Sequence, residues 1–183
     1  MTILYAFLLY PTRVFLNRGN HEDLAINISQ NFVPNFKKDT EIKFNKYGSY
    51  IFNQCQHLFQ QLPLATIVEN NSGFRCFVTH GGISSNTLDL DFISSLNRFS
   101  FPSLSVPVKS YNDPLKQKVA EILTDLVWSD PITSDMKNGP ITGSHSNNIR
   151  NIGKLFGSDV TAHFCKKHQF DAIVRSHECR PLG

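Results

Sequence analysis

Three apolar runs in this chain each lead into polar residues that include a histidine. The residues concerned are Asn20 and His21 after residues 14–16, His80 after residues 76–78, and His177 after residues 172–174. A short apolar run that gives way to glycine or polar residues is typical of a buried strand that opens into a loop. Active sites of α/β proteins gather at such strand ends. We therefore expect these side chains to meet, although they lie far apart in the sequence.

The types of these side chains are suited to metal-assisted hydrolysis. Imidazole nitrogen and amide oxygen suit divalent ions such as Mn, Fe or Zn, so Asn20, His80 and His177 could form a metal site. A bound metal lowers the pKa of its water and makes hydroxide available near neutral pH. His21 would face away from the metal and could protonate a leaving group, because histidine titrates near ~6.5.

Arginines near the same motifs could bind an anionic substrate. A guanidinium group binds phosphate as a bidentate fork, and Arg18, Arg150 and Arg175 are the candidates. Metal and arginine together predict the hydrolysis of a phosphoester. One histidine at a strand end, or a glycine pair after a strand, is more often structural, so the hypothesis depends on the joint placement of these residues. The other arginines and histidines near no such motif are interpreted as surface side chains: Arg13, Arg98, Arg180, His57, His145, His163 and His168.

The elements that would position these side chains can be predicted from periodicity and capping residues. Helices are predicted to begin near Leu24, to run from about residue 40 to residue 62, to begin at Pro114 after the capping Asp113, and to begin near residue 158. Strands are predicted at residues 64–68 and 74–78 around a turn, and again from Ala172. Residues 84–113 are predicted to be a surface excursion and residues 137–148 a loop. This mixture of hairpin strands and helices favours an α/β layered fold.

The bulk properties exclude several classes of protein. A length of 183 residues allows one domain with a real core. The net charge of +3 is small and scattered, so we expect no nucleic-acid partner. The first ten residues are apolar but too short to cross a bilayer, so we expect them to be a helix or strand of the domain and expect no membrane insertion. The four cysteines form no C-x-x-C pair, which favours a reduced, cytoplasmic location.

Four motifs in order resemble those of the metallo-dependent serine/threonine phosphoprotein phosphatases. They are RGNHE at residues 18–22, HGG at 80–82, LVWSDP at 126–131 and RSHE at 175–178. Three longer stretches are most similar to the EF-hand-containing, retinal-degeneration-C-type subfamily: NHED at 20–23, LPLAT at 62–66 and RSHECRP at 175–181. The resemblance covers nearly the whole chain.

The resemblance implies a metallophosphoesterase fold, with a central β-sandwich flanked by helices, and two divalent metal ions (Mn, Fe or Zn). It assigns Asn20, His80 and His177 to the second metal and His21 to the general acid. It also assigns Arg150, which precedes a Phe-Gly pair by six residues, to the substrate phosphate, although Asn151 stands where the family has glycine. The implied reaction is hydrolysis of phosphoserine and phosphothreonine in phosphoprotein substrates.

The chain also departs from the family. The motifs GDxHG and GDxVDRG, which supply the first metal's ligands and the bridging carboxylate, do not occur in the sequence. We therefore expect residues 1–183 to be a partial catalytic domain with the N-terminal strands missing, a fragment of a longer enzyme that keeps only the second-metal ligands. Calcium or calmodulin control would need regions outside this sequence.

Two other functions stay open. The chain could be a catalytically inactive pseudophosphatase that binds phosphoprotein or a partner. A metallophosphoesterase that acts on small phosphoesters is disfavoured by the motif at residues 126–131.

Overall fold

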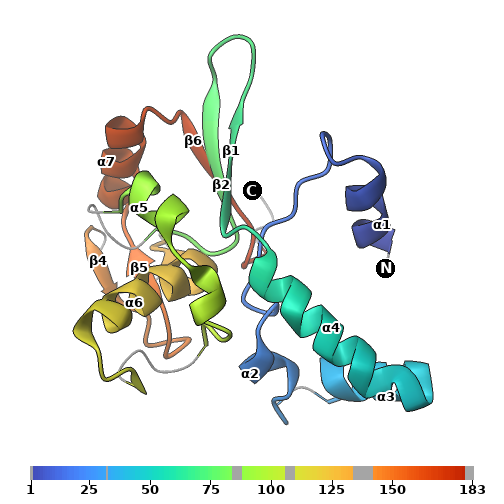
Figure 1. The fold of residues 1–183 in the computed structure, drawn as a ribbon. Coiled ribbons are helices and arrows are strands. Elements are labelled where there is room, and N and C mark those ends of the chain that lie inside the picture. Colours follow the sequence, from blue (N-terminus) through green and yellow to red (C-terminus); the bar gives the residue numbers. More distant parts are fainter. Residues whose placement is uncertain (1, 32, 84–87, 106–109, 134–141, 180–183) are drawn as a thin grey trace.

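The computed structural model describes residues 2–31, 33–83, 88–105, 110–133 and 142–179 (Figure 1). Its α-helices are α1 Thr2–Leu9, α2 Leu24–Asn27, α3 Phe36–Phe44, α4 Gly48–Gln61, α5 Leu90–Ser95, α6 Pro114–Trp128 and α7 Ser158–His168, and its short 3₁₀ helices are η1 Asn45–Tyr47 and η2 Arg98–Ser100. Its strands are β1 Ala65–Glu69, β2 Arg75–Thr79, β3 Asp130–Pro131, β4 Ser144–Ser146, β5 Lys154–Phe156 and β6 Ala172–Arg175. The predicted α/β class is confirmed.

The strands form two small mixed sheets. One sheet has the order β1-β2-β6, in which β1 and β2 make an antiparallel hairpin and β6 runs parallel to β2. The other has the order β3-β5-β4, in which β3 is parallel to β5 and β4 antiparallel to it. Because Thr79 pairs with Arg175 at the end of the parallel ladder, the loops that follow β2 and β6 leave the sheet side by side.

The hydrophobic core lies between β2, α6 and α7. Phe77 of β2 packs against Phe164 of α7, with ring centroids 5.1 Å apart, while Leu123 and Leu126 of α6 are fully buried. The Thr79 hydroxyl at the end of β2 donates to the Leu126 carbonyl oxygen at 3.0 Å, which holds the end of β2 against the C-terminal end of α6. Leu115 is 65% exposed, because it lies in the first turn of α6, before the helix reaches the core.

Several predicted elements are confirmed where local chemistry defines them. The side chain of Asp113 caps α6 by accepting a hydrogen bond from the Leu115 backbone N–H. The hairpin turn between β1 and β2 is held by Asn70, whose Oδ1 accepts hydrogen bonds from the backbone of Ser72 and Phe74. The helix predicted near residue 158 is α7, which begins there.

The strand predicted at residues 14–16 is not formed. This segment is irregular, and the side chain of Phe15 is 63% exposed. The chain is attached to the sheet through a side chain instead of a backbone ladder. Asn17 donates to the Val78 carbonyl oxygen at 3.1 Å and accepts from the Thr66 hydroxyl at 2.7 Å. An apolar run does not distinguish these two kinds of attachment.

The long helix predicted over residues 40–62 is two helices. Helix α3 ends at Phe44, Asn45 has a φ of 49°, and α4 begins at Gly48. A Cβ on Gly48 would lie 2.4 Å from the Cα of Glu41, so the two helices approach each other too closely for any other residue. The break therefore depends on tertiary packing.

Two predicted loops contain regular structure or core residues. The segment 84–113 was expected to be a surface excursion, yet it contains α5 and contributes Leu88, Phe101 and Leu104 to the core. In the segment 137–148, residues 137–141 lie outside the described part of the chain, and residues 144–146 form β4. The segment 84–113 is rich in serine and proline, and its buried apolar residues are isolated in the sequence. No apolar pattern therefore predicted that they belong to the core.

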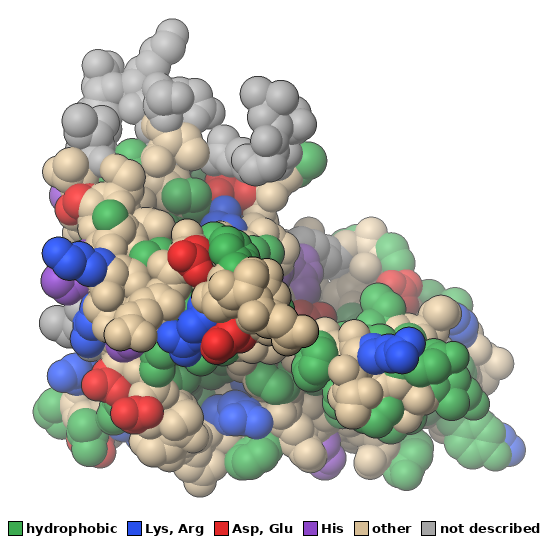
Figure 2. All heavy atoms as spheres, turned by 90° about the horizontal axis from the view of Figure 1, so that it is seen from above, with side chains coloured by type: hydrophobic (Ala, Val, Ile, Leu, Met, Phe, Trp, Pro, Cys, Tyr) green, Lys and Arg blue, Asp and Glu red, His purple; other side chains and the backbone are tan. Residues whose placement is uncertain are grey.

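The first residues form α1, as one of the two predicted alternatives. No side chain of this helix is buried, and Figure 1 shows it standing apart from both sheets. Within the described residues, no helix is long and apolar enough to cross a membrane. On the face seen in Figure 2, acidic and basic side chains of the described residues are interspersed with apolar ones.

Candidate metal and phosphate site

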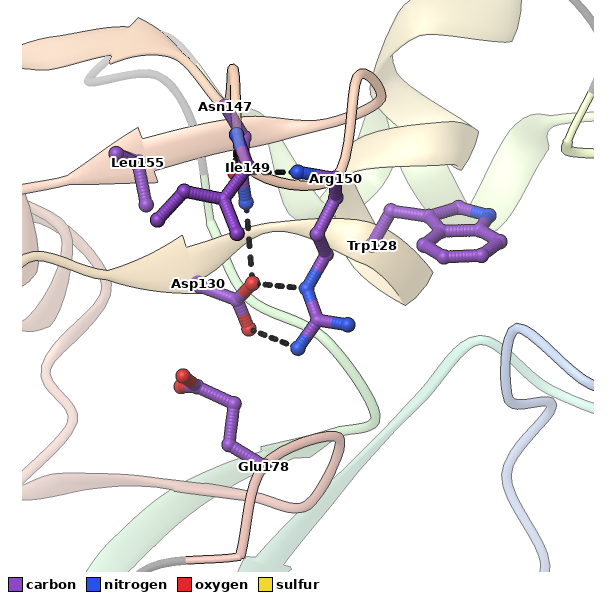
Figure 3. A pocket seen from close by; sticks show the side chains of 7 residues that line it. All are labelled: Trp128, Asp130, Asn147, Ile149, Arg150, Leu155 and Glu178. Atoms are coloured by element: carbon purple, nitrogen blue, oxygen red, sulfur yellow. Dashed lines mark hydrogen bonds and ion pairs between the residues drawn. The ribbon is translucent and has the colours of Figure 1, made fainter.

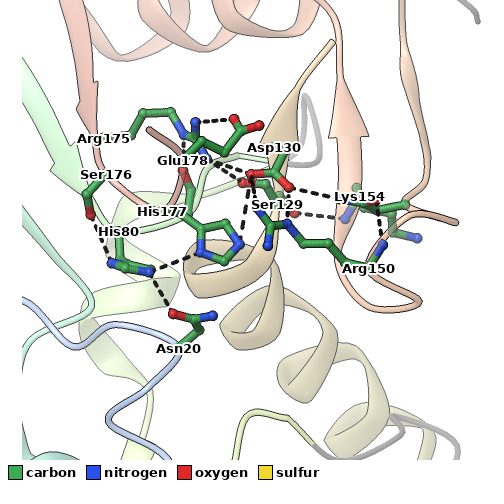
Figure 4. A network of polar contacts seen from close by, with 12 residues as sticks. Asn20, His80, Ser129, Asp130, Arg150, Lys154, Arg175, Ser176, His177 and Glu178 are labelled. Carbon is green, nitrogen blue, oxygen red and sulfur yellow. Dashed lines mark hydrogen bonds and ion pairs between the residues drawn. The ribbon is translucent and has the colours of Figure 1, made fainter. Parts of the chain in front are cut away.

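Asn20, His80 and His177 meet at one point, as their placement in the sequence predicts (Figure 4). His80 follows β2 and His177 follows β6, so the parallel pairing of these strands brings the two rings together. The Nε2 atom of His80 lies 2.8 Å from Asn20 Oδ1 and 3.2 Å from His177 Nδ1. His177 has a φ of 66°, and this left-handed turn directs its ring back toward His80.

The distances from His80 Nε2 to Asn20 Oδ1 and to His177 Nδ1 match the spacing of ligands around one metal ion. Two ligand atoms that lie about 2.1 Å from a metal at right angles to each other are about 3.0 Å apart. The observed separations of 2.8 and 3.2 Å bracket that value. Among the described residues, no group of three or more His, Cys, Asp and Glu could hold a metal, so an amide oxygen is needed to complete this set.

Both histidines are neutral at neutral pH. Burial lowers the pKa of His80 to about 4, and the positive charge of Arg175 acts in the same direction. Burial also lowers the pKa of His177 to about 4, assisted by the charge of Arg150 and opposed by that of Asp130. A neutral imidazole keeps the lone pair that a metal needs.

Asp130 lies at the centre of the polar network behind the histidines (Figures 3 and 4). Its buried carboxylate accepts hydrogen bonds from Arg150, from Arg175 at 2.8 Å and from Asn147 at 3.1 Å, and Oδ1 lies 3.8 Å from His177 Nε2. Burial alone would raise the pKa of Asp130. The hydrogen bond from Arg150 and the neighbouring positive charges outweigh burial, and the pKa lies below its usual value.

A cavity of about 330 Å³ opens in front of this network. It is lined by all five residues predicted for the site and by two others: Asn20, His21, His80, Arg150, His177, Glu178 and Cys179. A second cavity, of about 420 Å³, shares Arg150 and Glu178 with the first and is shown in Figure 3. The arrangement places the three candidate metal ligands, an arginine and an exposed histidine around one cavity.

The three candidate arginines have different environments. Arg150 is 30% exposed and lines the cavity while its Nε is bonded to Asp130. Arg18 is fully buried and donates to the carbonyl oxygens of Glu22 and Pro102. That burial excludes Arg18 as a phosphate ligand.

Arg175 is also used inside the protein. Its guanidinium donates to the Gly81 carbonyl oxygen at 2.6 Å and to the carboxylates of Asp130 and Glu178. Of the three arginines, Arg150 is thus the one that combines exposure with a place in the cavity. The roles of Arg150 in binding phosphate and of His21 as an acid stay predictions.

The glycines of the motifs allow close approaches that side chains would prevent. A Cβ on Gly81 would lie 2.6 Å from the backbone of Val127 at the end of α6. A Cβ on Gly19 would lie 2.9 Å from His80 Nδ1. The absence of a side chain at Gly81 lets its loop pack against α6, and the absence of one at Gly19 lets its loop pack against His80. A tight turn alone would not require glycine for this reason.

Three residues that contact a candidate ligand or Arg150 were given no role in the sequence analysis. Asp130 and Trp128 lie within the motif at residues 126–131, which supported the resemblance without a role for either residue. The ring of Trp128 meets that of His177 edge-on, with centroids 5.6 Å apart. Ser176, next to His177, contacts His80 with its hydroxyl at 2.9 Å. Adjacency to a predicted ligand was the only signal for it.

Comparisons with known proteins test the family resemblance. The family model "Calcineurin-like phosphoesterase" matches residues 2–181. The chain is 35% identical over 201 residues to serine/threonine-protein phosphatase with EF-hands 1 of Rattus norvegicus, covering 100% of this chain and 29% of that protein. It is 32% identical over 183 residues to serine/threonine-protein phosphatase rdgC of Drosophila melanogaster, covering 100% of this chain and 25% of the relative.

A solved structure gives the same result. It is a protein serine/threonine phosphatase from Saccharomyces cerevisiae with similarity to human phosphatase PP5, with a TM-score of 0.69 and 29% identity over 97% of this chain and 45% of that one. The resemblance inferred from the motifs is confirmed. The chain spans 25% to 29% of the length of the two curated relatives named here.

Proposed function

Because the chain belongs to the calcineurin-like phosphoesterase family, we propose that it carries part of a metal-dependent site that hydrolyses phosphoserine and phosphothreonine in proteins. The observation that carries this proposal is the meeting of Asn20, His80 and His177 at one edge of a cavity that Arg150 and His21 also line. Homology to serine/threonine protein phosphatases supports the substrate class.

The residues have separate tasks in this proposal. Asn20, His80 and His177 would hold one divalent ion, the second of the family's two ions (Mn, Fe or Zn), and such an ion activates water and neutralises charge on the phosphoryl group when bound. Arg150 binds phosphate oxygens with the part of its guanidinium that Asp130 leaves available. His21, exposed at the cavity, protonates the departing serine or threonine oxygen.

The setting of the protein is also proposed. The cysteines Cys55, Cys76, Cys165 and Cys179 are all free, which suits a reducing cytoplasm. A phosphoprotein is the expected partner, and neither nucleic acid nor membrane insertion is part of the proposal. Calcium or calmodulin control would act through regions outside this sequence.

A non-catalytic function is the second candidate. The sequence contains neither GDxHG nor GDxVDRG, the two motifs that the family resemblance assigns to the first metal. A chain with one metal-ligand set and an arginine can bind a phosphoprotein without hydrolysing it. Both candidate functions predict that the protein binds a phosphoprotein. Only the phosphatase predicts that the phosphate is hydrolysed.

Turnover of a phosphoserine peptide in Mn²⁺ separates the two. We compare the 183-residue chain with a chimera in which the family's two opening motifs precede residue 1, and with the same chimera carrying His177→Ala. Loss of one preorganised group commonly costs ~100-fold or more in rate, so the chain alone should be slower than the chimera by at least that factor. An active chimera that His177→Ala inactivates supports the phosphatase. A folded chimera that binds the peptide without turnover supports the non-catalytic function, and robust turnover by the 183-residue chain contradicts the partial site.

A further inference from the structure

The hydroxyl of Ser176 contacts the ring of His80 on the side away from the proposed metal. Ser176 Oγ lies 2.9 Å from His80 Nδ1, and the backbone N–H of Ser176 donates to the His80 carbonyl oxygen at 3.2 Å (Figure 4). One residue thus holds both the ring and the backbone of His80. The next residue in the chain is His177, so a change at Ser176 lies one residue from the second imidazole of the site.

The two nitrogens of the His80 ring have different surroundings. Nε2 faces Asn20 Oδ1 at 2.8 Å and His177 Nδ1 at 3.2 Å, while Nδ1 faces the Ser176 hydroxyl at 2.9 Å. A neutral imidazole has one N–H donor and one acceptor nitrogen, and the partner of one nitrogen decides the state of the other. A hydroxyl that accepts the Nδ1 proton leaves a lone pair on Nε2.

We propose that Ser176 is a positioning residue that accepts a hydrogen bond from Nδ1–H of His80 and so keeps the lone pair of Nε2 directed at a divalent metal ion. This inference rests on the proposed function, because it assumes that Asn20, His80 and His177 are the ligands. Groups that orient a metal-binding histidine through its other nitrogen typically change metal affinity 10–100-fold when removed.

A carboxylate lies near the second ring nitrogen of His177, beyond hydrogen-bond distance. This Nε2 atom is buried and points toward Asp130 Oδ1 at 3.8 Å, so the carboxylate favours the proton on that nitrogen and leaves Nδ1 with the lone pair. The lone pair of His80 Nε2 then faces an acceptor on Asn20 at 2.8 Å and another on His177 at 3.2 Å. Lone pairs at that spacing repel each other unless a proton or a metal ion lies between them. By accepting the proton at Nδ1, Ser176 favours the tautomer that binds a metal.

The first test is metal affinity, measured on the full chain. Trp128 is the only tryptophan and its ring touches that of His177, so quenching of its fluorescence by Co²⁺ reports binding at this site. Ser176→Ala should weaken Co²⁺ binding about 10-fold or more. Ser176→Thr, which keeps a hydroxyl, should retain most of the affinity. Ser72→Ala, which removes a hydroxyl from the hairpin turn, is the matched control and should bind like the wild type.

The second test is the hydrogen bond at His80 Nδ1, read from the ¹H and ¹⁵N chemical shifts of the ring in Zn²⁺-loaded protein. A metal on Nε2 leaves the proton on Nδ1, so the wild type and Ser72→Ala should show this proton at the low field of a hydrogen-bonded N–H, and Ser176→Ala should show it shifted upfield. Thermal unfolding of each variant confirms that it is folded. A role in stability alone would change the melting temperature and leave the Nδ1 proton shift and the Co²⁺ affinity unchanged.

The outcomes separate this inference from the proposed function. Wild-type affinity together with an unchanged Nδ1 proton shift in folded Ser176→Ala overturns the role of Ser176 and leaves the metal site intact. Equal Co²⁺ binding by the wild type and by His80→Ala overturns the metal site itself.

Discussion

Arg175 and Asp130 join the two sheets of the protein. Arg175 ends β6 in one sheet, Asp130 begins β3 in the other, and Arg175 Nη2 donates to Asp130 Oδ1 at 2.8 Å. Both side chains are largely withdrawn from solvent, at 15% and 4% exposed. Asp130 also accepts a hydrogen bond from Arg150, which lines the cavity. One carboxylate therefore connects both sheets with the cavity.

Removing this carboxylate should destabilise the protein strongly. Asp130→Ala leaves two arginines without their buried partner, and breaking a buried pair in this way costs ~3–5 kcal/mol in free energy of unfolding. Glu69→Ala is the matched control, since it breaks an ion pair with Arg75 in which Glu69 is 57% exposed; such pairs contribute ~0–1 kcal/mol. Urea denaturation measures the free energy of unfolding of both variants and of the wild type. Equal, small effects would show that Asp130 does not hold the sheets together.

The stability of the metal-free protein should fall at mildly acidic pH. His80 and His177 each have a pKa lowered from 6.5 to about 4 in the folded state by burial and by nearby arginines. Between these pH values the unfolded chain binds more protons, so the free energy of unfolding decreases as the pH falls through this window and levels off above it.

Melting temperatures in EDTA at about pH 7 and about pH 5 measure this effect, because the slope follows the difference in bound protons. His177→Gln removes one of the two titrating groups and should show a smaller decrease than the wild type. An identical decrease in the two proteins would mean that other groups are responsible.

Arg150 should determine the affinity for inorganic phosphate. A hydrogen bond to a charged group contributes ~1.5–3 kcal/mol, so Arg150→Ala should weaken phosphate binding about 10-fold or more. Arg150→Lys keeps the charge and loses the fork, so its affinity should lie between the two. Arg98→Ala is the control, because Arg98 donates to the Gln61 carbonyl oxygen and does not line the cavity. Isothermal titration of folded variants in Mn²⁺ gives the affinities. Wild-type phosphate affinity in Arg150→Ala would show that Arg150 bonds to Asp130 and does not bind phosphate.

The sequence predicted the convergence of the site for reasons that only partly hold. His80 and His177 do follow two strands, and the parallel pairing of those strands brings them together. Asn20 follows no strand; it reaches the site because the segment before it is attached through Asn17. The family motifs therefore predicted Asn20 more reliably than the apolar pattern did.

The features that could not be predicted depend on contacts between distant parts of the chain. The partners of Asp130 lie 17 to 45 residues away, so the residue at the centre of the network has no local signal. Arg18 and Arg150 both lie near motifs, and only burial distinguishes them. The break at Asn45 follows from the contact of Gly48 with Glu41, which helical periodicity does not record.

The central claim is that Asn20, His80 and His177 bind one divalent metal ion. Anomalous diffraction at the manganese edge, from crystals of the 183-residue chain grown with Mn²⁺, tests it most directly. The account predicts a peak about 2.0–2.2 Å from Asn20 Oδ1, His80 Nε2 and His177 Nδ1, and no such peak in crystals of His80→Ala. A manganese peak on other side chains, with this site empty in the same crystals, would contradict the account.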